Sequence, residues 1–144
     1  MKKYALFSGM LIPVWLFCGV LIAGFLYPGY SHVDQAMSEL GALEAPTHQL
    51  SPIISNFPLG VLFLLFGGAV VSLFSGARLA QFSGLLLMLH GLASISAGLF
   101  ACDPGCNPVA PSPDQVLHNL SGLVMFASLT LANLLWVYLA RKRV

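Results

Sequence analysis

Four long apolar runs constrain the fold of this chain more than any other feature. They cover Tyr4–Tyr27, Pro52–Phe74, Leu79–Ala101 and about Leu117–Ala140, and none contains Lys, Arg, Asp or Glu. Each is long enough to cross a bilayer, which takes about 20 apolar residues. Because the bilayer core offers no water to the backbone, each span must be helical. The sequence therefore predicts an all-α integral membrane four-helix bundle that forms a single domain over residues 1–144.

Composition excludes several functional classes. Of the 144 residues, 58% are hydrophobic and 8% are charged, which rules out a soluble globular protein, a disordered chain and a nucleic-acid binder. The chain also lacks a phosphate loop, a dinucleotide fingerprint, a zinc-protease motif and a nucleophile elbow. The expected partners are the lipid bilayer and other membrane helices, in a homo-oligomer or a larger complex, and no nucleic acid.

The charged residues predict the orientation of the spans. All basic residues fall on one side of the membrane: Lys2, Lys3, Arg78, Arg141, Lys142 and Arg143. All acidic residues fall on the other side: Asp34, Glu39, Glu44, Asp103 and Asp114. Because basic loops stay in the cytoplasm, we expect both termini to be cytoplasmic. The first run exceeds the 7–15 residues of a signal-peptide core and is expected to remain as an anchor.

The first outer loop carries the signals of a short helix. Ser31 and Asp34 fit a helix start, Val33, Met37 and Leu40 recur at helical spacing, and Gly41 can end the helix. This pattern predicts an amphipathic surface helix over about His32–Leu40. A plain cap with solvated charges fits the same pattern. Ser51 and Pro52 then predict the N-cap and first residue of the second span.

The second outer loop holds two cysteines around a turn. Pro104-Gly105 favours a tight turn that brings Cys102 and Cys106 together, on the side of the membrane where disulfides persist. A structural disulfide is the first interpretation. Metal binding and redox chemistry stay as alternatives, although two cysteines make a poor zinc site and the spacing differs from C-x-x-C. Ser112-Pro113-Asp114-Gln115 then predicts a capping box and a fourth helix over 113–140.

Few polar residues interrupt the spans. His90 and Ser94 share a face of the third span and are predicted to be buried, because an ionisable group in the membrane faces the bundle interior. His90 fits a neutral imidazole bonded to a serine or a carbonyl, with a ligand or proton-relay role as the alternative. Beside them, glycines recur every seven residues and predict a seam for a neighbouring helix. These are Gly84, Gly91 and Gly98.

Proline also interrupts the second span. Pro58 has no N–H and removes the helical hydrogen bond to the carbonyl of Ile54, and Asn56 lies near that opening.

A polar cluster on the outer face is the candidate site. Its members are Ser38, Glu39, Asp103 and His118, with His32 and His48 as additions. Carboxylate, imidazole and hydroxyl groups suit general acid–base catalysis or a hydrated metal ion, whose ligands would be Glu39, Asp103 and His118. They equally suit a network that ties loops to helix ends. We expect a carboxylate within hydrogen-bond or single-water reach of His118, and a solvated His48 of little importance.

The same loop residues carry a resemblance to a known family. Tyr30-Ser31, Ser38-Glu39-Leu40-Gly41, the segment 100–106 and His118 resemble domain-of-unknown-function family 998. The likeness covers about Leu11–Thr130. The family comprises multi-pass prokaryotic membrane proteins, so it implies a membrane fold and draws attention to Ser38, Glu39, Asp103 and His118. Typical members carry a further pair of spans, which makes this a short, four-span form, and the family implies no activity or cofactor.

Two functions compete on this basis. The first is a small non-enzymatic subunit or scaffold of a membrane assembly, because short loops leave almost no mass outside the membrane. The second is an outward-facing, membrane-embedded enzyme that acts on a lipid or lipid-linked substrate through Glu39, Asp103 and His118 and is metal-dependent if those residues hold an ion. The sequence identifies no cofactor for either function.

The charge asymmetry generates a topology prediction. In an Arg78→Cys variant that also carries Cys18→Ser, the new thiol should react with a membrane-impermeant maleimide only after the cells are opened, because basic loops stay in the cytoplasm. Labelling of position 78 from outside intact cells would reverse the orientation.

Overall fold

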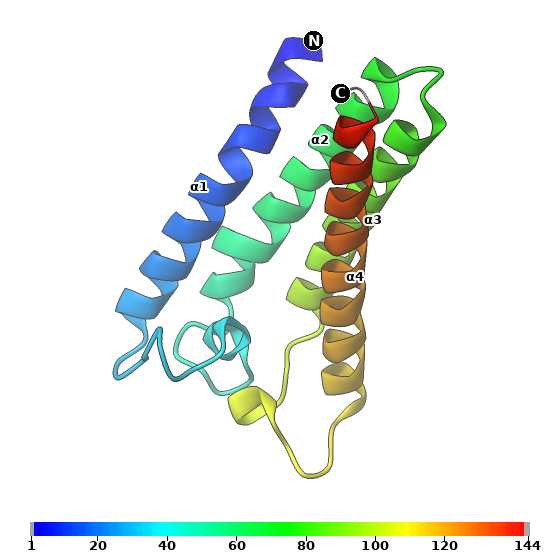
Figure 1. The fold of residues 1–144 in the computed structure, drawn as a ribbon. Coiled ribbons are helices and arrows are strands. Elements are labelled where there is room, and N and C mark those ends of the chain that lie inside the picture. Colours follow the sequence, from blue (N-terminus) through cyan, green and yellow to red (C-terminus); the bar gives the residue numbers. More distant parts are fainter. Residues whose placement is uncertain (1, 143–144) are drawn as a thin grey trace.

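The fold, described for residues 2–142 by a computed structural model with side chains from Phe7 onward, is built from four long helices joined by short loops (Figure 1). The elements are α1 (Lys2–Leu26), η1 (Met37–Gly41), η2 (Pro52–Asn56), α2 (Phe57–Leu73), α3 (Arg78–Leu99), η3 (Pro104–Cys106) and α4 (Pro113–Arg141). Each predicted span is present, and four helices are long and apolar enough to cross a membrane.

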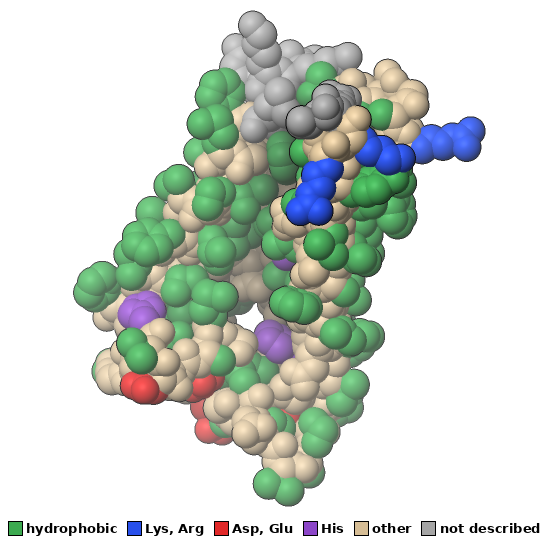
Figure 2. All heavy atoms as spheres, viewed as in Figure 1, with side chains coloured by type: hydrophobic (Ala, Val, Ile, Leu, Met, Phe, Trp, Pro, Cys, Tyr) green, Lys and Arg blue, Asp and Glu red, His purple; other side chains and the backbone are tan. Residues whose placement is uncertain are grey.

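Neighbouring helices pack in chain order, which leaves one side of the bundle open. α1 packs on α2, α2 on α3 and α3 on α4, whereas α1 and α4 make no extensive contact within the described residues (Figure 1). Both termini lie at one end, the termini end, and the two longer loops lie at the other, the loop end. Figure 2 shows basic side chains at the termini end and acidic ones at the loop end. Arg143 and the side chains of Lys2 and Lys3 lie outside the described part.

Glycines bring the backbones of α2 and α3 into direct contact. A Cβ atom built on Gly67 would lie 2.5 Å from the carbonyl oxygen of Gly84, and one built on Gly91 would lie 2.6 Å from that of Gly60. Gly98 continues this row of glycines on α3 and packs against Asn56 and Phe57 at the start of α2. The predicted seam is therefore confirmed, with a matching pair of glycines on α2. Such close approach matters because van der Waals packing replaces the hydrophobic effect between helices in lipid.

The gap that Pro58 opens in α2 is filled from α1. The indole Nε1 of Trp15 donates a hydrogen bond of 2.8 Å to the carbonyl oxygen of Ile54, which has lost its helical donor. The chain just before Pro58 is the π-helical turn η2, and its last carbonyl, that of Asn56, accepts 2.9 Å from the hydroxyl of Ser94 on α3. Hydrogen bonds at this proline thus tie three helices together near the loop end.

Polar side chains also attach α4 to α3. The Nδ1 atom of His90 lies 2.9 Å from the carbonyl oxygen of Met125, and the hydroxyls of Ser96 and Ser121 lie 2.8 Å apart. His90 and Ser94 are only 7% and 1% exposed. Because a buried polar group is costly unless it is bonded, these pairs fix how α4 sits on α3.

The first loop differs from the predicted surface helix. In place of a helix over His32–Leu40, it forms a turn at Ser31 followed by the short 3₁₀ helix η1. The Ser31 hydroxyl accepts the N–H of the residue three further on, which closes the turn. The side chain of Glu39 accepts the N–H of Ala36, the residue just before η1, and so caps the start of that helix. Two local side-chain caps therefore divide the segment that periodicity treats as one helix.

The start of the second span differs as well. Ser51 was expected to be an N-cap, but its backbone is already helical and its side chain makes no capping bond. Its N–H donates 2.8 Å to the carbonyl of Thr47, because the preceding turn leads directly into η2.

The glycine seam predicts opposite effects for two adjacent glycines. Gly67→Ala forces a Cβ into the Gly84 carbonyl and should lower the melting temperature in detergent by several degrees, since overpacking costs about 1–3 kcal/mol. Gly68→Ala meets nothing within 4 Å and should be neutral or stabilising, because alanine favours helix. Equal melting temperatures for both variants would contradict the seam.

Candidate functional site

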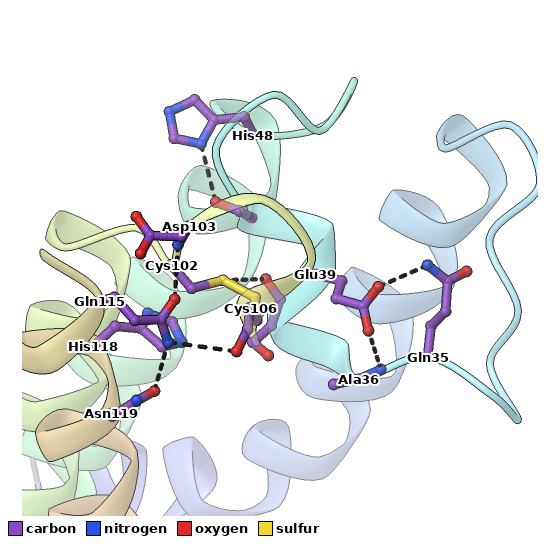
Figure 3. The surroundings of a disulfide bond; sticks show 12 residues. Gln35, Ala36, Glu39, His48, Cys102, Asp103, Cys106, Gln115, His118 and Asn119 are labelled. Atoms are coloured by element: carbon purple, nitrogen blue, oxygen red, sulfur yellow. Dashed lines mark hydrogen bonds between the residues drawn. A yellow bond between two sulfur atoms is a disulfide. The ribbon is translucent and has the colours of Figure 1, made fainter. Parts of the chain in front are cut away.

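The two loops at the loop end are clamped together. The N–H of Leu43 donates 2.8 Å to the carbonyl of Cys102, and the sulfur of Cys102 contacts the carbonyl of Ser38. Cys102 is joined to Cys106 in a disulfide, as predicted from their spacing. The intervening Gly105 has φ of 71°, a conformation that glycine adopts without strain, so the turn closes as expected. The loops therefore form one lid-like layer over the helices (Figure 3).

A buried glutamine connects this layer to α4. Gln115 is 1% exposed, its side-chain oxygen accepts 2.8 Å from the N–H of Asp103, and its side-chain nitrogen donates 2.8 Å to Asn119. Half of the predicted capping box is confirmed, because the Ser112 hydroxyl accepts the N–H of Gln115 at 3.1 Å. The reciprocal half is wrong, since Gln115 bonds the second loop instead. The sequence pattern is the same whether Gln115 bonds Ser112 or the second loop.

Asp103 completes the helix cap from the loop. Its Oδ2 atom accepts 2.9 Å from the N–H of Ser112, the group that the glutamine leaves free. The hydrogen bonds from the backbone and then the side chain of Ser112 hold the pKa of Asp103 below its usual value. This carboxylate is therefore an ionised structural acceptor.

Glu39 serves the first loop in the same way. Its two oxygens accept from the N–H of Ala36 at 2.9 Å and from the side chain of Gln35 at 2.8 Å. Figure 3 shows it directed toward those residues and away from His118. Burial, and then the Glu39 charge, raise the pKa of the nearby Tyr30 hydroxyl. Both predicted carboxylates are consequently engaged in loop structure.

His118 bonds a carbonyl group where a carboxylate was expected. Its Nδ1 atom lies 2.8 Å from the carbonyl oxygen of Phe100, which comes just after α3. Among the described residues, no hydrogen bond or ion pair joins it to Glu39 or Asp103, and no three His, Cys, Asp or Glu residues form a group that could hold a metal ion. Within the described residues His118 therefore makes no direct hydrogen bond to a carboxylate, whereas a contact through a single water stays a prediction.

Ser38 and His118 instead line a cavity of about 660 Å³ beneath the loop layer. All four helices contribute to its walls, so it occupies the side where α1 and α4 stand apart. Figure 2 shows the molecule hollowed between the loop end and α4. Its apolar lining includes Leu16, Val20, Leu40, Phe57, Leu59 and Met125, and its polar lining includes Ser38, His48, Gln49, Asn56, Ser94 and His118. None of the lining residues that the structure describes is acidic or basic apart from the histidines.

His48 belongs to this cavity, which corrects the expectation of a solvated side chain. It is half-buried, and its Nδ1 atom lies 3.0 Å from the carbonyl oxygen of Gly41. Because a carbonyl can only accept, both His48 and His118 carry their proton on Nδ1 when neutral, which leaves Nε2 as an acceptor. The sequence indicated His48 as an addition to the outer cluster but not its partial burial, because the loop brings it to the cavity through contacts distant in sequence.

Comparison with known proteins identifies one family. A family model described as "Protein of unknown function (DUF998)" matches residues 10–144. The chain belongs to the DUF998 family. The match takes in both loops and nearly all of the four helices, so it confirms and extends the resemblance carried by the loop motifs. No curated protein matches the chain significantly, and neither does any solved structure. The function of this DUF998 protein must therefore be argued from its own geometry.

The role of Asp103 can be tested by amide exchange. Asp103→Ala should speed deuterium uptake at residues 107–112, because the Ser112 N–H loses its acceptor. The lowered pKa means that this stabilisation is present above about pH 4, the unfolded value, and is lost as the pH falls through the folded value. Asp114→Ala removes an exposed carboxylate of the same helix start and is the control. Equal protection in both variants would show that Asp103 is not the cap.

Proposed function

We propose that this DUF998 protein spans a prokaryotic-type cytoplasmic membrane with both termini inside, and that its loop-end cavity binds one amphipathic lipid from the outer leaflet. The cavity is the observation that carries the proposal. A space of about 660 Å³ with mostly apolar walls and a few polar groups is typical of small-molecule sites.

The charge distribution supports the orientation. The described basic side chains, Arg78, Arg141 and Lys142, belong to the termini end, where positive residues favour the cytoplasm. The acidic residues belong to the loop end, which carries the disulfide. An extracytoplasmic loop end places that disulfide in an oxidising compartment and opens the cavity to the outer leaflet.

The gradient of polarity inside the cavity supports an amphipathic ligand. His48 and Gln49 come from the loop layer, and His118 lies about 8 Å along α4 from Pro113, at head-group depth. Deeper along α4 the lining is Gly122 and Met125. Such a site would hold a polar head beside the histidines and an apolar chain below them.

The geometry favours binding over catalysis. An acid–base or metal mechanism at this site was predicted to use Glu39 and Asp103 with His118. The oxygens of Glu39 accept hydrogen bonds from the first loop, and Asp103 caps α4. Because redirecting either carboxylate would leave a backbone N–H without its partner, these groups suit a structural role.

A second candidate function, a subunit of a membrane assembly, has its own support. Thr130 and Asn133 are exposed on the part of α4 that lies in the apolar span. Polar side chains at this depth commonly bond neighbouring helices, including those of a second copy. Lipid binding and helix association are compatible, because a subunit can hold a lipid at its interface.

The binding proposal predicts loss of lipid when a cavity histidine is removed. The protein extracted in mild detergent should retain a lipid that native mass spectrometry detects. His48→Leu and His118→Leu should each reduce its occupancy about tenfold, the effect of losing roughly one hydrogen bond to the head group. His48 comes from the first loop and His118 from α4, so a local folding defect would not produce the same result twice.

His32→Leu is the matched control, because His32 is exposed and does not line the cavity. It should retain the lipid at the level of the unaltered protein. A protein that retains no lipid in any form, or equal retention in all three variants, would contradict the binding function. Recovery of another membrane polypeptide in place of lipid would favour the subunit role.

A further inference from the structure

A second hollow continues from the cavity along α4. It has a volume of about 420 Å³ and shares Gly122 and Met125 with the cavity. Its remaining walls include His90, Phe126 and Leu129. Because the two spaces share two lining residues, they adjoin along α4, and together they extend from the loop end toward the middle of the span.

Gly122 lies where the two spaces meet. A Cβ atom built on it would meet nothing within 4 Å, so the space beside it is open, and a larger side chain would extend into that space. Along α4 the rise from His118 to Leu129 is about 16 Å, a distance that only a long extended alkyl chain covers.

The deeper walls suit hydrocarbon. The amide nitrogen of Asn133, near the far end, donates 2.8 Å to the carbonyl of Leu129 in its own helix, and the Nδ1 atom of His90 is bonded to the carbonyl of Met125. With these hydrogen bonds made inside the protein, Phe126 and Leu129 give the hollow a mainly apolar surface, to which Thr130 adds a hydroxyl group.

The upper walls suit an uncharged head group. With Nδ1 of His48 and His118 held by carbonyl groups, each neutral ring offers Nε2 as an acceptor. A hydroxyl group is the matching donor. The described lining holds no Lys or Arg for a phosphate and no carboxylate for an amine.

We infer that the ligand is a neutral, hydroxyl-bearing lipid with one long chain, which leaves the cavity over Gly122 and lies along α4 as far as Leu129. The inference rests on the proposed lipid-binding function and deepens it. Gly122 becomes the residue that sets chain-length preference, because only long chains reach the second hollow.

The test measures binding of three monoacylglycerols by native mass spectrometry, with each probe at the same mole fraction in the detergent micelle. The unaltered protein should bind monopalmitoylglycerol about tenfold more tightly than monohexanoylglycerol, because the extra methylenes add packing contacts in the second hollow. Monodecanoylglycerol should lie between them. In Gly122→Leu this preference should disappear, while binding of the hexanoyl probe remains.

Gly68→Leu is the control, since Gly68 also has open space beside it but lies on α2 outside both hollows. It should keep the full chain-length preference. Binding that is independent of chain length, or a preference that survives in Gly122→Leu, would overturn the inference and leave lipid binding standing. Tighter binding of palmitoyl lysophosphatidic acid than of monopalmitoylglycerol would overturn the neutral head group. No binding of any probe by the unaltered protein would overturn the proposed function as well.

Discussion

The close contact between the backbones of α2 and α3 is the constraint on which the remaining structure depends. Gly60 and Gly67 on α2 meet Gly91 and Gly84 on α3, so the two central helices approach until carbonyl oxygens lie where side chains would begin. α1 then attaches to the η2 turn at the start of α2 through the Trp15 bond, and α4 attaches to α3 through His90. Because each outer helix packs on a different central helix, α1 and α4 stay apart, and the cavity occupies the space between them.

Features encoded by local pattern could be predicted from the sequence. The spans follow from length and hydropathy, the glycine seam from a heptad spacing on α3, and the disulfide from a proline–glycine turn between two cysteines. The free carbonyl opposite Pro58 was also predictable, although its donor was not. Trp15 lies 39 residues away from Ile54 in the chain, and no local rule pairs a tryptophan on one span with a proline gap on another.

The candidate site was predictable only in part, because loop carboxylates have to satisfy backbone donors before they can serve a ligand. Asp103 takes the N–H at the start of α4, and Glu39 takes the N–H at the start of η1. The sequence predicted both carboxylates beside His118, because all three residues fall on the same side of the predicted spans. Ser38 and His118, both expected at the outer face, line the cavity, whereas the partial burial of His48 and the partners of Gln115 depend on the three-dimensional path of the loops. What remains is a site whose described lining has no Lys, Arg or carboxylate and has two imidazoles held by carbonyl groups, which suits recognition of a hydroxyl group.

The most direct measurement of this account is a crystal structure of the unaltered protein grown in a monoolein mesophase, where the host lipid is itself a neutral single-chain glycerol ester. We predict elongated electron density in the cavity, with the glycerol group within hydrogen-bond distance of Nε2 of His118 and the chain passing over Gly122 beside Met125. A cavity filled by ordered water, with lipid chains only on the outer surfaces of α1 and α4, would contradict it.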